Sequence, residues 1–297
     1  MSKDVVLIPA WQRPEFLWHC LANLKRCEGA DQLHYIFWFD QGHTPELHEV
    51  IKGFPFSHEV QGPQRKGWRD SKQSYAVLMG YRYAASKAKQ FVFMVEEDVM
   101  VRTDFFQYHY AVHAQHPGLF CSIAVANPNR LMFDTGANDQ YYLSGGDYCS
   151  LGVCYRSAIL QTLVDPHANT TYFLNMPDYC KRHFPTSPFG YSFAEQDGLI
   201  RRIQWSLAKL YPIAYPWTPR AYHAGLYGKN RGKGPSGSFA VRLKYVTEVI
   251  YSDEAMRTFA KHPEWYEDSR PIDLQAPPWS NTMHLLPIDL SKNPLRA

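Results

Sequence analysis

The sequence has no apolar run long enough to cross a membrane, because no window approaches the roughly 18 consecutive apolar residues that a spanning helix needs. The first residues, Met1 to Asp4, lead directly into a short apolar segment and lack the longer apolar stretch of a secretory signal peptide. We therefore expect a cytoplasmic protein without a membrane span.

Paired cysteines and a strong charge excess are also missing. The six cysteines include no C-x-x-C pair and lie mostly in apolar segments, which predicts buried free thiols in a reducing compartment. Cys149 and Cys154 are close enough in sequence that a bond between them stays open. The formal net charge of +3 does not by itself indicate a nucleic-acid or membrane partner.

Signatures of common phosphate-transfer enzymes are absent too. The sequence contains neither a glycine-rich phosphate loop with its lysine nor the motifs of a protein kinase. A cation-dependent nucleotidyltransferase or phosphotransferase is therefore a weak alternative. What the chain has in quantity is apolar residues, at 45%, and aromatic residues, at 15%, which suffice for a large core and for surfaces that stack on sugars or bases.

The apolar pattern alternates between strand-like and helix-like segments. Apolar runs of strand length occur at 5–8, 35–39, 91–95 and 119–126. Helical patterns lie between them, and such alternation predicts an α/β fold with a mainly parallel central sheet flanked by helices. Substrates of such sheets bind at the carboxyl ends of the strands, where Asp40 and the acidic run at 96–98 are expected.

Local signals predict where the helices begin. Pro14 and Pro45 are suited to the first turn of a helix, and a helix is expected over about 71–88. Thr103 is predicted as an N-cap, and Ser192 with Glu195 matches the S-x-x-E pattern of a capping box.

The acidic triplet Glu96-Glu97-Asp98 is the most informative motif. Three carboxylates at the end of an apolar strand repel one another, and burying them is costly without a compensating charge. A divalent cation removes that cost, and oxygen ligands of this kind suit Mg²⁺ or Mn²⁺. The alternative is an acidic turn that leads into the helix at Thr103.

The triplet lies in a segment that resembles the metal-binding motif of GT-A fold glycosyltransferases. The resemblance is closest to the N-acetylglucosaminyltransferases that initiate complex N-glycans, and it also covers inverting family 2-like transferases. It extends over about 220 residues in the same order, through the segments 8–14, 39–42, 93–99, 103–106, 145–152, 195–197 and 220–225.

The resemblance implies a GT-A-like nucleotide-binding sandwich over residues 1–262. Residues 1–100 would form the nucleotide-binding half and 101–262 the acceptor half, followed by a Pro- and Trp-rich extension over 263–297. It implies Mn²⁺ or Mg²⁺ as cofactor and a nucleotide-sugar donor, with UDP favoured. The donor-site residues that it implies are Pro9, Arg13, Asp40, Glu96 and Glu97, with Asp98 on the metal.

Individual roles follow by position. Arg13 would meet the donor near its diphosphate, and Asp40 would accept a hydrogen bond from a uracil-like base. A surface salt bridge and a simple turn cap are the respective alternatives. Because the triplet here reads Glu-Glu-Asp rather than ending in two aspartates, whether Glu96 or Glu97 contacts the metal or the ribose stays open.

Transfer to a hydroxyl also needs a base that removes its proton. Asp197 matches the second acid of the family's catalytic pair, while Glu195 is the alternative, already engaged in the predicted capping box. A single base with direct attack implies inversion at the anomeric carbon. His223 resembles the position where many GT-A enzymes place a histidine on the metal, although a structural histidine is the common reading of a lone His.

A glycine-rich basic segment follows His223. Lys229 and Arg231, with Lys233, are predicted to neutralise the donor diphosphate as part of a closing lid, and a solvated loop is the alternative.

The acceptor is the least determined part of the sequence reading. A glycan, a protein, a small molecule and a hydroxymethylated base of phage-type DNA all remain open. The DNA alternative rests on the basic residues of the segment 229–233 and on Arg65, Lys66, Arg69 and Lys72. The expected activity is a hexosyl- or pentosyltransferase, and a non-catalytic sugar- or nucleotide-binding module on the same scaffold is the alternative.

Overall fold

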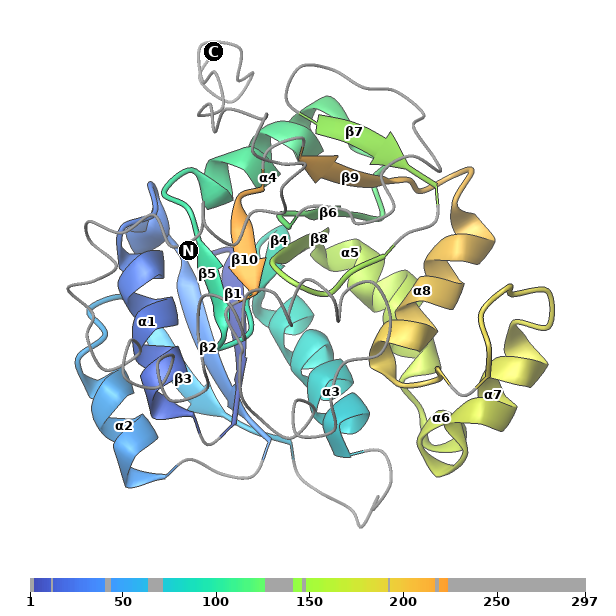
Figure 1. Ribbon diagram of the computed structural model, residues 1–297, viewed down its shortest axis with the longest axis horizontal. Helices are drawn as coiled ribbons and strands as arrows, with labels where there is room; N and C mark the ends of the chain where they lie inside the picture. The colour runs from blue at the N-terminus through green and yellow to red at the C-terminus, as the bar shows by residue number, and fades with distance from the viewer. Residues whose placement is uncertain are drawn as a thin grey trace, which may run out of the picture.

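A central mixed β-sheet organises the protein in the computed structural model, which describes residues 3–11, 13–40, 44–63, 72–125, 141–145, 148–191, 193–216 and 219–223. The sheet has eight strands in the order β3-β2-β1-β4-β8-β6-β9-β7 (Figure 1). These are β1 Val5–Ala10, β2 His34–Phe39, β3 His58–Gln61, β4 Phe91–Met94, β6 Cys121–Ile123, β7 Tyr141–Ser144, β8 Val153–Arg156 and β9 Ile213–Pro216.

The strand directions divide this sheet into two parts. Strands β3, β2, β1 and β4 run parallel, and so do β6 and β9. Strand β8 is antiparallel to both β4 and β6, and β7 is antiparallel to β9. The predicted α/β fold with a mainly parallel sheet is confirmed, and the parallel pairings concentrate in the half built before residue 95.

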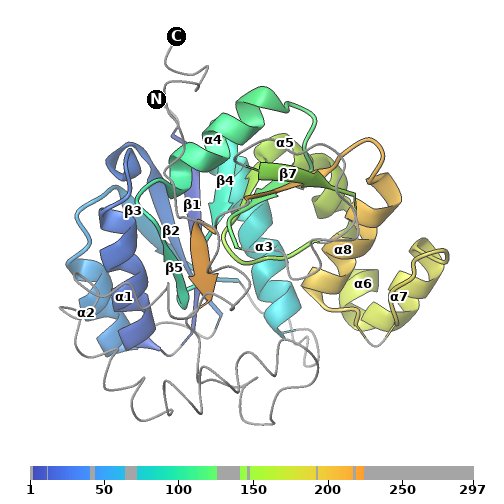
Figure 2. The same cartoon turned by 45° about the horizontal axis from the view of Figure 1, so that its top comes forward.

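Helices cover both faces of the sheet. Side chains of β1 alternate between the faces: Val6 and Ile8 pack with α1 and α2, and Val5 and Leu7 pack with α3. Figures 1 and 2 show α1 and α2 on one side of β1 and β2 and α3 on the other. The helices are α1 Pro14–Lys25, α2 Pro45–Lys52, α3 Lys72–Lys87, α4 Phe105–Gln115, α5 Ser157–Ile159, α6 Thr170–Leu174, α7 Met176–His183 and α8 Gln196–Leu207.

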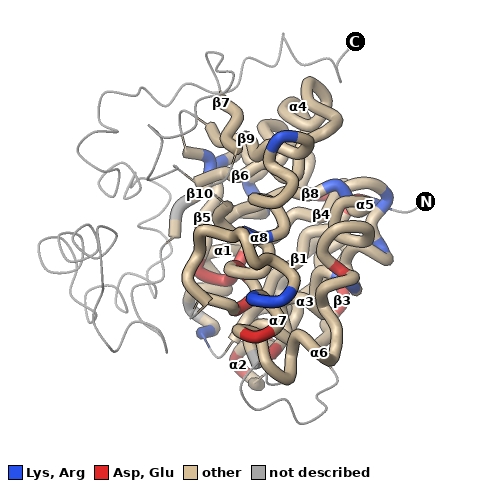
Figure 3. The backbone as a smooth tube through the Cα atoms, turned by 90° about the vertical axis from the view of Figure 1, so that its right-hand side faces the viewer, with Lys and Arg blue, Asp and Glu red and all other residues tan. Residues whose placement is uncertain are grey.

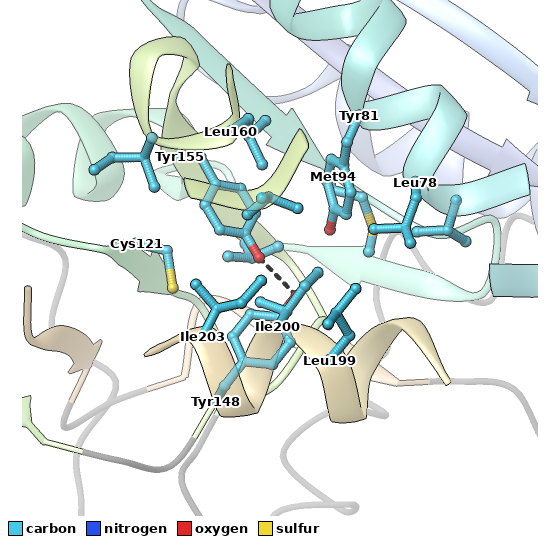
Figure 4. Close-up of a cluster of buried hydrophobic side chains, with 14 of the residues drawn as sticks. Leu78, Tyr81, Met94, Cys121, Tyr148, Tyr155, Leu160, Leu199, Ile200 and Ile203 are labelled. Atoms are coloured by element: carbon cyan, nitrogen blue, oxygen red, sulfur yellow. Dashed lines mark hydrogen bonds between the residues drawn. The ribbon is translucent and has the colours of Figure 1, made fainter. Parts of the chain in front are cut away.

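Helix α8 is anchored in the core on the α3 side of the sheet. Leu199, Ile200 and Ile203 of this helix face Leu78 of α3, together with a group of buried tyrosines (Figure 4). In that group the hydroxyl of Tyr155 donates a 2.6 Å hydrogen bond to the hydroxyl of Tyr148. This packing sets the position of the first turn of α8, which carries one of the predicted catalytic acids.

Two predicted helix starts are wrong. Helix α4 begins at Phe105 with Asp104, not Thr103, at the N-cap position, and no side-chain cap forms. The carboxylate of Asp104 instead forms an ion pair with the buried Arg220, at 2.8 Å. A tertiary partner has therefore taken the side chain that a local cap would use.

The predicted capping box is wrong as well. Helix α8 begins at Gln196, which puts Glu195 at the N-cap instead of the third helical position, and the Glu195 side chain makes no cap hydrogen bond. Ser192 lies outside the described residues. The physical reason lies in the preceding segment, which folds back onto the first turn of α8 and delays the start of the helix.

Further expectations concern the cysteines, a membrane span and the C-terminal extension. All six cysteines are free thiols, five of them buried, so Cys149 and Cys154 form no disulfide. No helix among the described residues is long and apolar enough to span a membrane. The predicted extension over 263–297 lies outside the described residues. Charged positions of both signs are scattered along the described chain (Figure 3).

Candidate active site at the carboxyl edge of the sheet

Parallel pairing brings the predicted donor-site residues to one edge of the sheet. Ala10 pairs with Phe39, so the segment after β1 and Asp40 after β2 leave the sheet side by side. Strand β4 pairs with β1 on its other side, and the acidic triplet follows β4. The backbone N–H of Glu97 then donates to the carbonyl of Pro9, at 3.3 Å. Pro9 therefore contacts the triplet through its backbone carbonyl.

Two of the three acids are buried beneath Arg13. Glu97 is 2% exposed and Asp98 is 3% exposed, whereas Glu96 is half-buried. Arg13 Nε lies 2.6 Å from Glu97 Oε1, and Arg13 Nη1 lies 2.7 Å from Asp98 Oδ2. The backbone N–H of Trp11 donates to the other carboxylate oxygen of Glu97. Arg13 therefore forms salt bridges, as the alternative for this residue has it, but with buried partners, and its contact with a donor stays a prediction.

A second, smaller sheet brings His223 to the triplet. Strands β5 Val99–Val101 and β10 Ala221–His223 pair antiparallel, with His223 opposite Val99, and they lie side by side in Figures 1 and 2. As a result, His223 Nε2 lies 3.4 Å from Asp98 Oδ2. Within the described part of the chain, the other oxygen, Asp98 Oδ1, is buried and has no hydrogen-bond partner.

The electrostatics of the triplet favour additional positive charge. Burial, reinforced by the neighbouring carboxylates, raises the pKa of Glu96 well above its ordinary value. Burial also raises the pKa of Glu97 to about 8, because it outweighs the opposing effect of Arg13. Burial acts in the same direction on Asp98, but His223 and Arg13 together hold its pKa below the ordinary value. A single guanidinium thus does not compensate all three acids.

The described side chains supply only part of the ligand set that a divalent cation needs. Among the described residues, no group of three or more His, Cys, Asp and Glu side chains is arranged to hold a metal ion. Asp98 and His223 do meet, and the buried, unpartnered Asp98 Oδ1 is the kind of oxygen that Mg²⁺ or Mn²⁺ binds. One or two protein ligands suffice for such an ion when substrate phosphates complete its shell.

The predicted base lies on helix α8, facing the same edge. Asp197 is the second residue of α8 and is half-buried. Ser150 Oγ donates a hydrogen bond to Asp197 Oδ2, at 3.2 Å. Burial raises the pKa of Asp197 to about 6, and the Ser150 hydrogen bond and Arg201 oppose that rise. Asp197 also adds to the raised pKa of Glu96.

Glu195 lies differently from Asp197. Its side chain is exposed at the N-cap position, and its backbone carbonyl accepts the N–H of Leu199, at 2.8 Å. Since Glu195 forms no capping box, the two acids differ in their exposure: Glu195 is exposed and Asp197 is half-buried.

Of the remaining predicted site residues, the structure describes the side chain of Asp40 alone. Lys229 and Arg231, together with Lys233, lie outside the described residues, as do Arg65, Lys66, Arg69 and the Lys72 side chain. Asp40 is half-buried at the end of β2.

Sequence reasoning missed two residues beside Asp197. Ser150 lies in the segment 145–152, which carries part of the resemblance, but nothing in that segment indicates a contact with Asp197, 47 residues further along the chain. Arg201 follows Asp197 by one helical turn, a spacing that places both on one face of a helix. That spacing was the available signal.

The described chain has an α/β fold with a parallel half-sheet, an antiparallel strand β8 next to β4, and the acidic triplet after β4. No protein-family model matches the sequence, and no curated protein matches it. Among solved structures, the chain is similar to S. aureus TarS 1–349 in complex with UDP-GlcNAc, with 13% identity and a TM-score of 0.48 over 94% of this chain and 77% of that one. It is also similar to mouse xyloside xylosyltransferase 1 in its apo form, with 11% identity and a TM-score of 0.44 over 70% of this chain and 84% of that one.

Proposed function

We propose that the protein is a metal-assisted, inverting glycosyltransferase that moves a sugar from a nucleotide-sugar donor to an acceptor hydroxyl. The observation that carries the proposal is the presence of two acids in a strained electrostatic environment, Asp98, which is buried, and Asp197, which is half-buried. Asp98 has a buried carboxylate oxygen without a partner among the described residues, and Asp197 is held by Ser150 close enough to act on Glu96. This is a cation position beside a base.

The donor binds along the carboxyl edge of β1, β2 and β4 in this proposal. Arg13 already binds two carboxylates there, and its guanidinium also suits the oxygens of a diphosphate. Asp40, next to the end of β1, accepts a hydrogen bond from the base, and the resemblance at this position favours uridine. Glu96 and Glu97 lie between these two regions, beside the ribose or the metal.

Asp98 and His223 are the ligands that would hold Mn²⁺ or Mg²⁺. When bound, the ion supplies electrostatic stabilisation of the negative charge that grows on the departing diphosphate. Arg13 supplies a fixed positive charge to the same oxygens. Glu97, buried and tied to the Trp11 backbone and to Arg13, orients that guanidinium.

Asp197 accepts the proton of the acceptor hydroxyl. The acceptor oxygen forms a bond to the anomeric carbon as the bond from that carbon to the phosphate oxygen breaks, and the electron pair leaves with the nucleotide diphosphate. A pKa of about 6 keeps Asp197 ionised at neutral pH while leaving it more basic than an ordinary aspartate. Attack from one face with one base inverts the anomeric configuration.

The acceptor is a hydroxyl of a glycan, a protein or a hydroxymethylated base of DNA. The basic residues that favour DNA lie outside the described part of the chain, so the acceptor class rests on the sequence. Incubation with the donor and each acceptor class, read by mass, distinguishes them.

The experiment that tests the function is a thermal-shift screen of nucleotide diphosphates and nucleotide-sugars with and without Mn²⁺. A ligand that binds the folded state raises the melting temperature with its affinity and concentration. We expect a shift with one nucleotide diphosphate that grows when Mn²⁺ is added and that is lost in Asp98→Asn. Asp31→Asn, at an exposed position, is the matched control. No shift with any nucleotide would overturn the proposal. A metal-independent shift without transfer would favour the binding module.

A further inference from the structure

The backbone around Asp197 is held by a buried arginine on the same helix. Arg202 is fully buried, and Gly198 has no room for a side chain, because a Cβ there would overlap the carbonyl oxygen of Phe193. The Arg202 guanidinium donates to four backbone carbonyls, those of Phe193 at 2.5 Å, Gly190 at 2.7 Å, Gly198 at 2.9 Å and Phe189 at 3.0 Å. The segment 189–193 is thereby fastened onto the first turn of α8.

The same turn is tied to the neighbouring helix. Gln196, the first residue of α8, donates its backbone N–H to Ser74 Oγ of α3, at 3.1 Å. Ser74 Oγ in turn donates to Gln196 Oε1, at 2.9 Å. Both residues are buried. The Cα of Asp197 is therefore fixed from both sides, and what remains to be determined is the orientation of its carboxylate.

Ser150 contacts this carboxylate from the segment that leads into β8. It is 7% exposed and lies shortly before β8, whose Val153 pairs with Met94, the last residue of β4. The triplet follows β4 after Val95, so the segment that carries Ser150 leads into a strand that is paired with the one before the triplet. The 3.2 Å bond from Ser150 Oγ to Asp197 Oδ2 links the base to this strand. Oδ1 of Asp197 takes no part in this hydrogen bond.

Charged and titratable groups from several elements surround Asp197. Burial raises its pKa, Arg201 and Ser150 lower it, and Glu195 raises it. Asp197 in turn acts on groups of four further segments, which are Glu96 after β4, Tyr81 of α3, Tyr148 and Cys149 before β8, and Tyr172 of α6. Ser150 stands out in this shell as a neutral hydroxyl that touches the carboxylate directly.

We propose that Ser150 is a positioning residue for the base: its hydroxyl holds Oδ2 of Asp197, which presents Oδ1 to the acceptor hydroxyl. This inference rests on the proposed function, since the acceptor hydroxyl belongs to that reaction. The hydrogen bond stabilises the ionised carboxylate and selects one rotamer of it. Without the hydroxyl, Asp197 keeps its backbone position but loses both the preferred orientation and part of its ionisation at neutral pH.

The activity test compares Ser150→Ala with Ser150→Thr, which keeps the hydroxyl. We expect Ser150→Ala to lower kcat about 10- to 100-fold, the effect of one hydrogen bond to a charged group, with the KM for the donor unchanged. The ascending limb of the pH profile should move to higher pH. Ser150→Thr should recover most of kcat and of the pH profile. Ser206→Ala, at the far end of α8, is the control for general loss of a serine.

A second measurement does not need activity. The difference in unfolding free energy between a protein and its Asp197→Asn variant depends on pH with the pKa of Asp197. We expect the midpoint of that dependence to rise by about one pH unit in the Ser150→Ala background. An unchanged midpoint, or a Ser150→Ala enzyme with normal kcat, would overturn the positioning role. A shifted midpoint without transfer in any variant would keep the role and overturn the proposed function.

Discussion

Replacing Asp197 with Asn should raise stability and abolish transfer, two effects that only a buried functional acid combines. Burial raises the pKa of Asp197 to about 6, against about 3.9 for an unperturbed aspartate. Each unit corresponds to 1.36 kcal/mol, so ionised Asp197 lowers the free energy of unfolding by about 3 kcal/mol at neutral pH. Asparagine has nearly the same shape and carries no charge.

The size of this effect depends on pH in a defined window. Below about pH 4 the carboxyl is protonated in both the folded and unfolded states, so wild type and variant should be equally stable. Between about pH 4 and 6 the unfolded state ionises while the folded state stays protonated, and wild type loses stability relative to the variant. Above about pH 6 the difference is constant at its maximum.

The assay is chemical denaturation of both proteins at several pH values from 4 to 8, with Asp31→Asn as the exposed control. Alongside it, kcat should fall by about 10²–10⁴, the usual contribution of a general base, with nucleotide binding nearly intact. Near-normal turnover in Asp197→Asn would refute the base assignment. A variant that is less stable than wild type at pH 8 would refute the burial argument.

Three further predictions follow from the site and its support. Asp98→Ala should abolish transfer, weaken nucleotide binding and remove the Mn²⁺-dependent part of the thermal shift, because it deletes the buried oxygen that the ion binds; an unchanged Mn²⁺ response would contradict it. The kcat of wild type should rise with pH through about 6, where Asp197 becomes ionised; a profile flat from pH 5 to 8 would contradict this. Gly198→Ala should destabilise the protein by about 2 kcal/mol or more, because the new Cβ overlaps the Phe193 carbonyl, whereas Gly53→Ala, where a Cβ meets only one atom at 3.9 Å, should change the unfolding free energy much less.

Local sequence patterns were sufficient for three neighbouring strands of the sheet, β2, β1 and β4, and for several helix starts. The apolar runs at 5–8, 35–39 and 91–95 became β1, β2 and β4, and Pro14 and Pro45 open α1 and α2 as predicted. Apolar period, proline and strand length act over a few residues, so they can be read without knowing the rest of the fold. The short strands β5 and β10 have no such signal, since each exists through its pairing with the other.

The two wrong helix starts have a common physical cause. At α4, the carboxylate of Asp104 pairs with Arg220, and at α8, Arg202 fastens the segment 189–193 onto the first turn. In each case a buried arginine binds groups close to the predicted cap residues rather than those residues themselves. A cap contributes about 1 kcal/mol, which a buried ionic or multiple hydrogen-bonding contact can exceed.

The sequence by itself determined the chemical inventory: an α/β chain, acids at the ends of apolar strands, and Asp197 near the start of a helix. Parallel strands bring their carboxyl ends together, so even the meeting of Arg13 with the triplet could be anticipated in outline. Only the tertiary structure decided that His223 lies 3.4 Å from Asp98 and that Ser150 holds Asp197. Both contacts join residues far apart in the chain, and their existence depends on how β10 and β8 pair, which no short stretch of sequence encodes.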